Sequence, residues 1–297
     1  MNRVYLVDKN SVCRAWHCAT TLKTSTGIET QAVMGIITTL LKIKSIDKNN
    51  KIMVLDDGHA TFRYEIYPEY KGNRAPKDEK AKQRNEAYYA QAPFIDKALD
   101  ALGVMKVRAE NYEADDLAGW ICTRNNQQKF TLVSSDKDWL ILLSPNVDWF
   151  DMRANKLIEL KTLVYQTNST NPEAFLMKKA LMGDPSDNIK GVGGFGEKRA
   201  TEVSNKYGTL DNLLGHFSDE DMKKSWFKKL VTSEEMQEIY RRNIMLMDIR
   251  HKYLPNILIE TQKSVFDENK FIELCSELEF NSFISQIIKF KELFNAK

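Results

Sequence analysis

The sequence lacks any apolar run long enough to cross a membrane, because no window approaches the roughly 18 residues that a spanning helix needs. Asp8 also stands ahead of any apolar run of signal-peptide length. Cysteine is scarce, and the four cysteines form no CxxC pair, which argues against a disulfide framework. We therefore expect a soluble, non-secreted protein that works in a reducing compartment.

Net charge and histidine are also nearly missing. The sequence has 43 Lys and Arg against 41 Asp and Glu, a net charge of +2. This balance does not indicate a nucleic acid partner, so any such signal must come from segregation of the two signs along the chain. The chain has four histidines, and Cys13, His17 and Cys18 lack the second ligand pair that a structural zinc site needs. We find no internal repeat and no low-complexity linker.

Short apolar runs of β-forming residues alternate with helical patterns in the first half of the chain. The runs predict buried strands at 4–7, 52–55, 104–107 and 130–135, and apolar spacing predicts helices at 30–46 and 87–102. Strands that alternate with helices form a mostly parallel sheet with right-handed crossovers, and ligands bind at its carboxyl edge. The expected fold class is therefore α/β, with a central twisted sheet flanked by helices.

Each predicted strand delivers acids at or just beyond its carboxyl end. These acids are Asp8, Asp57, Glu113, Asp115, Asp116, Asp136 and Asp138. A single acid of this kind is usually a turn or cap residue, and the 113–116 cluster also suits the first turn of a helix. Because four strands share the feature, we expect the acids to converge on one edge of the sheet.

Many carboxylates in one pocket repel one another, and burying an unpaired charge costs several kcal/mol. Divalent cations resolve this conflict, and carboxylate oxygens favour Mg²⁺ over zinc. Two such ions roughly 3.5–4 Å apart stabilise the attacking and leaving oxygens in phosphodiester hydrolysis. The sequence therefore predicts metal-assisted hydrolysis of a phosphodiester.

A basic stretch with Gly and Pro, residues 67–84, lies between two acid-bearing strands. Taken alone it fits a solvated, charged helix. At this place in the chain, Lys71 and Arg74 could meet a phosphate while Tyr70 stacks on a base.

A helix, glycine hairpin, helix unit follows at 171–208, and its turn matches GxGxxG. No strand precedes the turn, so the dinucleotide fold is excluded, and the lysine spacing of a P-loop is also absent. A turn that exposes backbone at a helix N-terminus suits a nucleic acid phosphate. The candidate residues are Gly191, Gly193, Gly194, Gly196, Lys198 and Arg199, with Asp184 and Asp187 ahead of them.

These motifs together resemble the 5′-nuclease family, which includes flap endonucleases, bacteriophage 5′-3′ exonucleases and the 5′-nuclease domain of bacterial DNA polymerase I. The resemblance covers nearly the whole chain. It rests on Tyr5-Leu6-Val7-Asp8, Tyr70-Lys71-Gly72-Asn73-Arg74, Glu113-Ala114-Asp115-Asp116, Ser135-Asp136-Lys137-Asp138, Leu181-Met182-Gly183-Asp184-Pro185-Ser186-Asp187-Asn188-Ile189 and Glu277-Leu278-Glu279-Phe280. Lys9 and Asn10 stand where the family usually has Gly-Ser or Gly-Thr.

The resemblance implies a PIN-like nuclease core at 1–170 with a helical arch at about 67–93. It also implies a helix-hairpin-helix-type module at 171–250 and a C-terminal segment at 251–297 that packs on the core. Asp8, Asp57, Glu113, Asp115 and Asp116 would hold one Mg²⁺, and Asp136, Asp138, Asp184 and Asp187 a second. Lys71 and Arg74 would contact the scissile phosphate. Mn²⁺ could replace Mg²⁺, and the glycine hairpin could hold K⁺.

The implied activity is that of a 5′-3′ exonuclease and flap endonuclease that cleaves 5′ flaps and RNA primers during DNA replication. The expected substrates are DNA with a single/double-strand junction and RNA-DNA primers, and the protein would act as a monomer in bacterial or bacteriophage-infected cytoplasm. A polymerase or a single-strand-binding protein is a plausible partner. The alternatives are a non-enzymatic DNA-binding protein on the same scaffold and a PIN-type ribonuclease.

Overall fold

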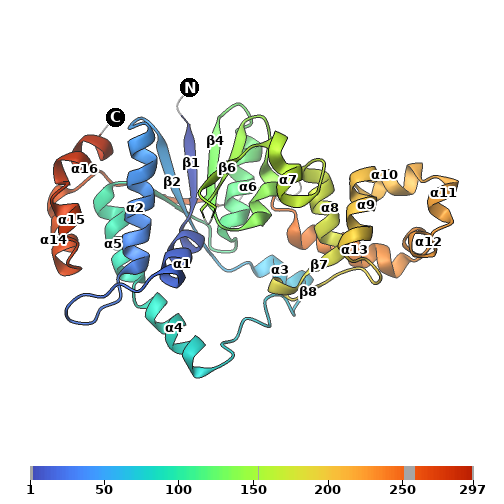
Figure 1. Cartoon of the computed structure of the whole chain (residues 1–297), viewed down its shortest axis with the longest axis horizontal. Helices are drawn as coiled ribbons and strands as arrows, with labels where there is room; N and C mark the ends of the chain where they lie inside the picture. The colour runs from blue at the N-terminus through green and yellow to red at the C-terminus, as the bar shows by residue number, and fades with distance from the viewer. Residues whose placement is uncertain (1–2, 153, 251–257, 296–297) are drawn as a thin grey trace.

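A seven-stranded sheet forms the centre of the computed structural model, which describes residues 3–152, 154–250 and 258–295 (Figure 1). Its strand order is β6-β5-β4-β1-β2-β3-β9, with parallel pairing from β5 to β3 and an antiparallel strand at each edge. The strands are β1 Val4–Asp8, β2 Lys51–Asp56, β3 Met105–Arg108, β4 Phe130–Ser134, β5 Val147–Asp151, β6 Lys156–Ile158 and β9 Glu260–Gln262. The predicted α/β fold with a mostly parallel sheet is confirmed.

Helices cover both faces of this sheet, as the alternation of buried side chains along β1 requires. Tyr5 and Val7 belong to one apolar layer, whereas Val4 and Leu6 belong to the other. The first layer includes α1 Lys9–Ala19, α2 Gln31–Ile46, α5 Ala92–Leu102, α14 Glu268–Glu277, α15 Asn281–Ile284 and α16 Ile287–Phe294. The second includes α3 Thr61–Ile66, α6 Ala114–Arg124, the 3-10 helix η1 Lys137–Leu142 and one side of α8 Pro172–Met182.

A helical module with its own apolar core extends from one side of the sheet (Figure 1). After the short segments η2 Leu160–Thr162 and α7 Leu163–Thr167, α8 leads into β7 Gly183–Asp184, η3 Pro185–Asp187 and β8 Ile189–Lys190. The remaining helices are α9 Glu197–Tyr207, α10 Leu210–His216, α11 Asp219–Met222, α12 Ser225–Thr232 and α13 Glu234–Met247. The predicted helix, hairpin, helix unit is therefore present as α8 and α9.

Two local features differ from the sequence prediction. Residues 87–102 are not one helix, because α4 Glu79–Tyr89 ends before Gln91 and α5 starts anew with Pro93 in its first turn. Proline has no N–H to continue a helix but fits its beginning. Helix α1 was not predicted, although Asp8 caps it by accepting a hydrogen bond from the Ser11 N–H at 2.9 Å.

The C-terminal helices pack on the core against α2 and α5. The C-terminal segment was predicted to begin at residue 251. Residues 251–257 lie outside the described part of the chain. Within the described ranges, no helix has both the length and the apolar character that crossing a bilayer requires.

Candidate active site

A cleft of about 870 Å³ lies at the carboxyl edge of the sheet, where the predicted acids follow strands β1 to β4. The acids that line it are Asp8, Asp57, Glu113, Asp115, Asp136, Asp138 and Asp187. Lys71 and Arg74 line the same cleft. Asp184 lies next to it, in a small pocket shared with Asp115, Asp138 and Asp187. The structure thus brings together residues that are up to 179 positions apart in the sequence, from Asp8 to Asp187.

Backbone N–H groups hold several of these carboxylates in place. Asp8 caps α1 and also accepts a hydrogen bond from the Ser134 hydroxyl at 2.9 Å. Asp57 accepts the Ala114 N–H at the start of α6 at 2.9 Å, and Asp136 accepts the Asp138 N–H at 2.9 Å. The same strand-end turns that begin the helices therefore aim the acids into the cleft.

Burial and crowding raise the pKa of the innermost acids. Burial, followed by the charge of Asp57, raises the pKa of Asp8 to about 7. Burial and the charge of Asp138 raise the pKa of Asp136 to about 6. Burial also raises the pKa of Asp115 well above its usual range, with Asp136 and Asp8 adding to the effect. The cleft therefore disfavours negative charge on its own and favours a cation.

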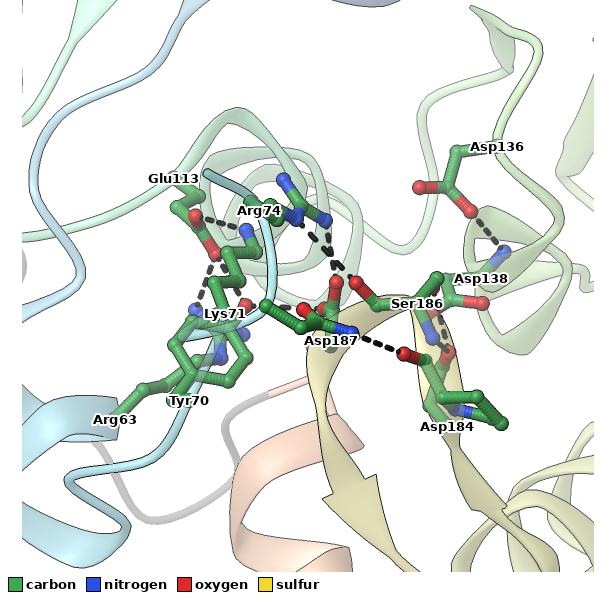
Figure 2. Close-up of polar contacts among 12 residues, drawn as sticks. Arg63, Tyr70, Lys71, Arg74, Glu113, Asp136, Asp138, Asp184, Ser186 and Asp187 are labelled. Atoms are coloured by element: carbon green, nitrogen blue, oxygen red, sulfur yellow. Dashed lines mark hydrogen bonds and ion pairs between the residues drawn. The ribbon is translucent and has the colours of Figure 1, made fainter. Parts of the chain in front are cut away.

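Basic side chains contact the outer acids, and Figure 2 shows Arg63, Lys71 and Arg74 among them. Lys71 pairs with Glu113, and Arg74 pairs with Asp187. Lys179 on α8 pairs with Asp138 and lies 3.2 Å from Asp184.

Lys179 was not singled out in the sequence. Burial opposes the charge on Asp184, but Lys179 and Ser186 together hold its pKa below the usual value. A lysine five residues before Asp184 could have been suspected only once α8 was known to end at the cleft.

Asp116 does not line the cleft, contrary to its predicted role as a metal ligand. It is fully buried, and its two oxygens accept hydrogen bonds from the Arg63 guanidinium at 2.6 and 2.7 Å. One of these oxygens also accepts the Glu113 N–H at 2.9 Å, which completes a capping box at the start of α6. Asp116 and Arg63 form a buried ion pair beneath the site.

The position of Tyr70 does not suit its predicted role, which was to stack on a base. Its ring is only 3% exposed and belongs to the apolar core. The hydroxyl donates toward Glu113 at 2.9 Å and Asp187 at 3.3 Å, as Figure 2 shows. A tyrosine whose ring is covered cannot present a face to a base, so Tyr70 instead supports two of the acids from below.

The donor chemistry of the cleft fits hard divalent cations, because carboxylate oxygens are the groups that Mg²⁺ and Mn²⁺ prefer. Within the described ranges, no three His, Cys, Asp or Glu side chains are gathered closely enough to hold an ion as they stand. The outer acids Glu113, Asp187 and Asp138 are instead paired with Lys71, Arg74 and Lys179 respectively. The cleft therefore collects the ligands without a preformed cage.

The glycine turn stands between β8 and α9, on the same module as Asp184 and Asp187. A Cβ at Gly191 would lie 2.2 Å from the Met182 carbonyl oxygen, and Gly194 has a φ of +88°. Both positions therefore need glycine.

The other side of this turn is open. A Cβ at Gly193 or Gly196 would meet nothing within 4 Å. Lys198 and Arg199 are exposed in the first turn of α9, and the Arg199 guanidinium donates to the Gly194 carbonyl at 2.8 Å. Its carbon also lies 5.5 Å from the centre of the Trp226 ring. The turn offers open backbone and positive charge together.

An α/β core with an acid-lined sheet edge, joined to a helical module with a glycine turn, defines a recognisable class of protein. The family model described as the 5′-3′ exonuclease N-terminal resolvase-like domain matches residues 3–170. The model described as the 5′-3′ exonuclease C-terminal SAM fold matches residues 170–266. The chain therefore belongs to the 5′-3′ exonuclease family.

Individual relatives agree with this assignment. DNA polymerase I of Bacillus caldotenax is 31% identical over 294 residues, which cover 96% of this chain and 32% of the relative. DNA polymerase I of Bacillus subtilis is 28% identical over 297 residues, with the same shares. The chain thus spans about a third of the length of these curated relatives.

Solved structures share the fold. The D15 protein of bacteriophage T5, co-crystallised with metal ions, has a TM-score of 0.68 at 22% identity, covering 97% of this chain and 99% of that one. The catalytic core of Rad2 in complex with DNA has a TM-score of 0.59 at 13% identity, covering 97% and 92%.

Proposed function

We propose that the protein is a divalent-metal-dependent 5′-nuclease that hydrolyses phosphodiesters near a junction of single- and double-stranded nucleic acid. One observation carries the proposal: acids from four strand ends line one cleft together with Lys71 and Arg74. Family membership supports it, as do related folds crystallised with metal ions and with DNA.

The acids that would hold two Mg²⁺ ions are Asp8, Asp57, Glu113, Asp115, Asp136, Asp138, Asp184 and Asp187. When bound, the ions would lower the pKa of water and stabilise charge on the attacking and leaving oxygens. Mn²⁺ has the same ligand preference and should replace Mg²⁺. The inner acids Asp8, Asp115 and Asp136 carry raised pKa values, so they have the most to gain from a cation.

Lys71 and Arg74 would bind the scissile phosphate. Each now pairs with an acid of the cleft, Glu113 and Asp187 respectively. A phosphate can take the place of these carboxylates, because Lys and Arg bind both through the same charge-assisted hydrogen bonds. Release of Glu113 and Asp187 from their basic partners would free their oxygens for metal when substrate arrives.

The glycine turn with Lys198 and Arg199 would bind the backbone of the duplex without reading bases. Carbonyl oxygens at this turn could also hold K⁺. The proposed substrates are 5′ flaps and RNA-DNA primers during replication, processed by a monomer in the cytoplasm of a bacterium or of a phage-infected cell. A polymerase or a single-strand-binding protein would be the protein partner.

Product mapping on a flap duplex tests this function. A 5′-labelled flap should be released as a defined product in Mg²⁺ and remain uncut in EDTA. Binding without cleavage would favour the non-enzymatic alternative. Preferential cleavage of single-stranded RNA over the flap would favour a PIN-type ribonuclease.

A further inference from the structure

One face of α1 is fastened to the C-terminal half of α4, the helix that begins within the basic stretch 67–84. Asn10, Arg14 and His17 lie at helical spacing on this face. The carbon of the Arg14 guanidinium lies 4.2 Å from the centre of the Tyr88 ring, and the His17 Nε2 atom lies 3.1 Å from the Arg84 carbonyl oxygen. Tyr88 is the buried residue of α4, so this contact seats the whole helix.

A chain of two hydrogen bonds leads from this seat to the cleft. The Tyr88 hydroxyl donates to the Asn10 Oδ1 at 2.5 Å, and the Asn10 Nδ2 donates to the Asp57 Oδ2 at 2.8 Å. The other oxygen of Asp57 accepts the Ala114 N–H at 2.9 Å. One oxygen of Asp57 is therefore held by α6, and the other by Asn10 of α1, which in turn is bonded to Tyr88 of α4.

The opposite end of the 67–93 segment is fastened to the helical module. The Lys71 N–H donates to the Asp187 carbonyl at 2.9 Å, and the Asn73 side chain donates to the Pro185 carbonyl at 2.7 Å. The Asn188 side chain donates to the Glu69 carbonyl at 2.8 Å. The 67–93 segment is thus bonded near one end to residues 185–188, just ahead of the glycine turn. Near its other end it is bonded through Tyr88 and Asn10 to Asp57.

We propose that Asn10 and Tyr88 are positioning residues, which couple the seating of α4 on α1 to the orientation of Asp57. The proposal rests on the proposed function, because it assigns these residues to the same cleft. Asn10 occupies one of the two positions where this chain departs from the usual sequence after Asp8. The Asn10 amide accepts from Tyr88 through its oxygen and donates to Asp57 through its nitrogen, so one side chain joins the two residues.

Tyr88→Phe separates this role from simple packing, because it removes the hydroxyl and keeps the ring against Arg14. In single-turnover cleavage of a flap duplex, the rate should fall about tenfold while the Kd for the duplex stays within about twofold. Asn10→Ala should lose a similar factor, and the double variant should be no slower than Asn10→Ala alone, because both changes break one chain. Tyr89→Phe is a control on the same helix. Tyr89 is 60% exposed, and the change removes its hydrogen bond from Arg14 at 3.0 Å but leaves the hydrogen bonds from Tyr88 to Asn10 and from Asn10 to Asp57, so the cleavage rate should match the wild type.

Amide exchange in EDTA supplies a readout without catalysis. Exchange in α4 should speed up in Tyr88→Phe and in Asn10→Ala relative to the wild type. A Tyr88→Phe rate equal to the wild type, multiplicative losses in the double variant, or unchanged exchange in α4 would overturn the proposal. Failure of the wild-type protein to cut the flap would instead refute the proposed function.

Discussion

Replacing Asp8 by Asn should stabilise the metal-free protein, although it removes a residue from the candidate active site. Asn is as good an N-cap as Asp, so the hydrogen bond from the Ser11 N–H to the side chain can persist. Ser134 can rotate its hydroxyl to accept from the new amide. What the substitution removes is a buried negative charge that faces Asp57 and Asp136.

The pKa of Asp8 gives the size and the sign of the effect. It rises from 3.8 to about 7 on folding, and each pKa unit corresponds to about 1.4 kcal/mol. Because the folded pKa lies above the unfolded one, proton binding by Asp8 adds to the free energy of unfolding. This contribution is fully present below pH 3.8 and is lost as the pH rises through 7. Asp8→Asn should therefore match the wild type near pH 4 and exceed it by up to about 4 kcal/mol at pH 8.

Urea unfolding in EDTA at several pH values between 4 and 8 measures this difference. Asp184→Asn is the matched control with the opposite sign, because Lys179 and Ser186 lower the pKa of Asp184, and its loss should destabilise the protein at pH 8. Mg²⁺ should reduce the difference in unfolding free energy between the wild type and Asp8→Asn. A difference that does not change with pH, or an Asp8→Asn protein less stable than the wild type at pH 8, would refute the reasoning.

Three further predictions concern separate parts of the molecule. Asp116→Asn leaves the buried Arg63 with Glu113, 3.2 Å away, as its remaining acidic partner and should cost up to roughly 3–5 kcal/mol in urea unfolding; a loss of activity at unchanged stability would contradict this. Lys71→Ala should lower the single-turnover cleavage rate by at least about 100-fold with a smaller change in Kd; a change confined to Kd would contradict it. Gly191→Ala should lower the Tm and weaken duplex binding, because the added Cβ clashes with the Met182 carbonyl. Gly193→Ala should leave the Tm unchanged, because its Cβ meets nothing within 4 Å. Equal Tm and Kd values for the two variants would count against the assigned turn.

The sheet and its acidic edge could be predicted because both follow from local patterns. Four apolar runs were long enough to identify as strands, and parallel strands bring their carboxyl ends to one edge. Strand β9 could not be predicted in this way, since Glu260–Gln262 is polar and exposed. The break between α4 and α5 depended on Pro93, which suits the interior of neither helix but fits the start of α5.

The direction of individual side chains was the part that sequence could not supply. Asp115 and Asp116 are neighbours on α6, yet one faces the cleft and the other faces Arg63 in the core. Tyr70 is buried although it stands in a basic stretch. Asn10 contacts Asp57 and Lys179 contacts Asp138, each more than 40 residues away in the chain, so no local pattern marks these contacts.

The most direct test of the central claim, that the acids at the sheet edge hold divalent ions for hydrolysis, is cleavage of a 5′-labelled flap duplex by Asp136→Ala. The assay uses saturating protein and Mg²⁺, with DNA binding measured in parallel. Asp136→Ala should bind the duplex about as tightly as the wild type and give no detectable cleavage. Cleavage by Asp136→Ala at the wild-type rate would contradict the central claim.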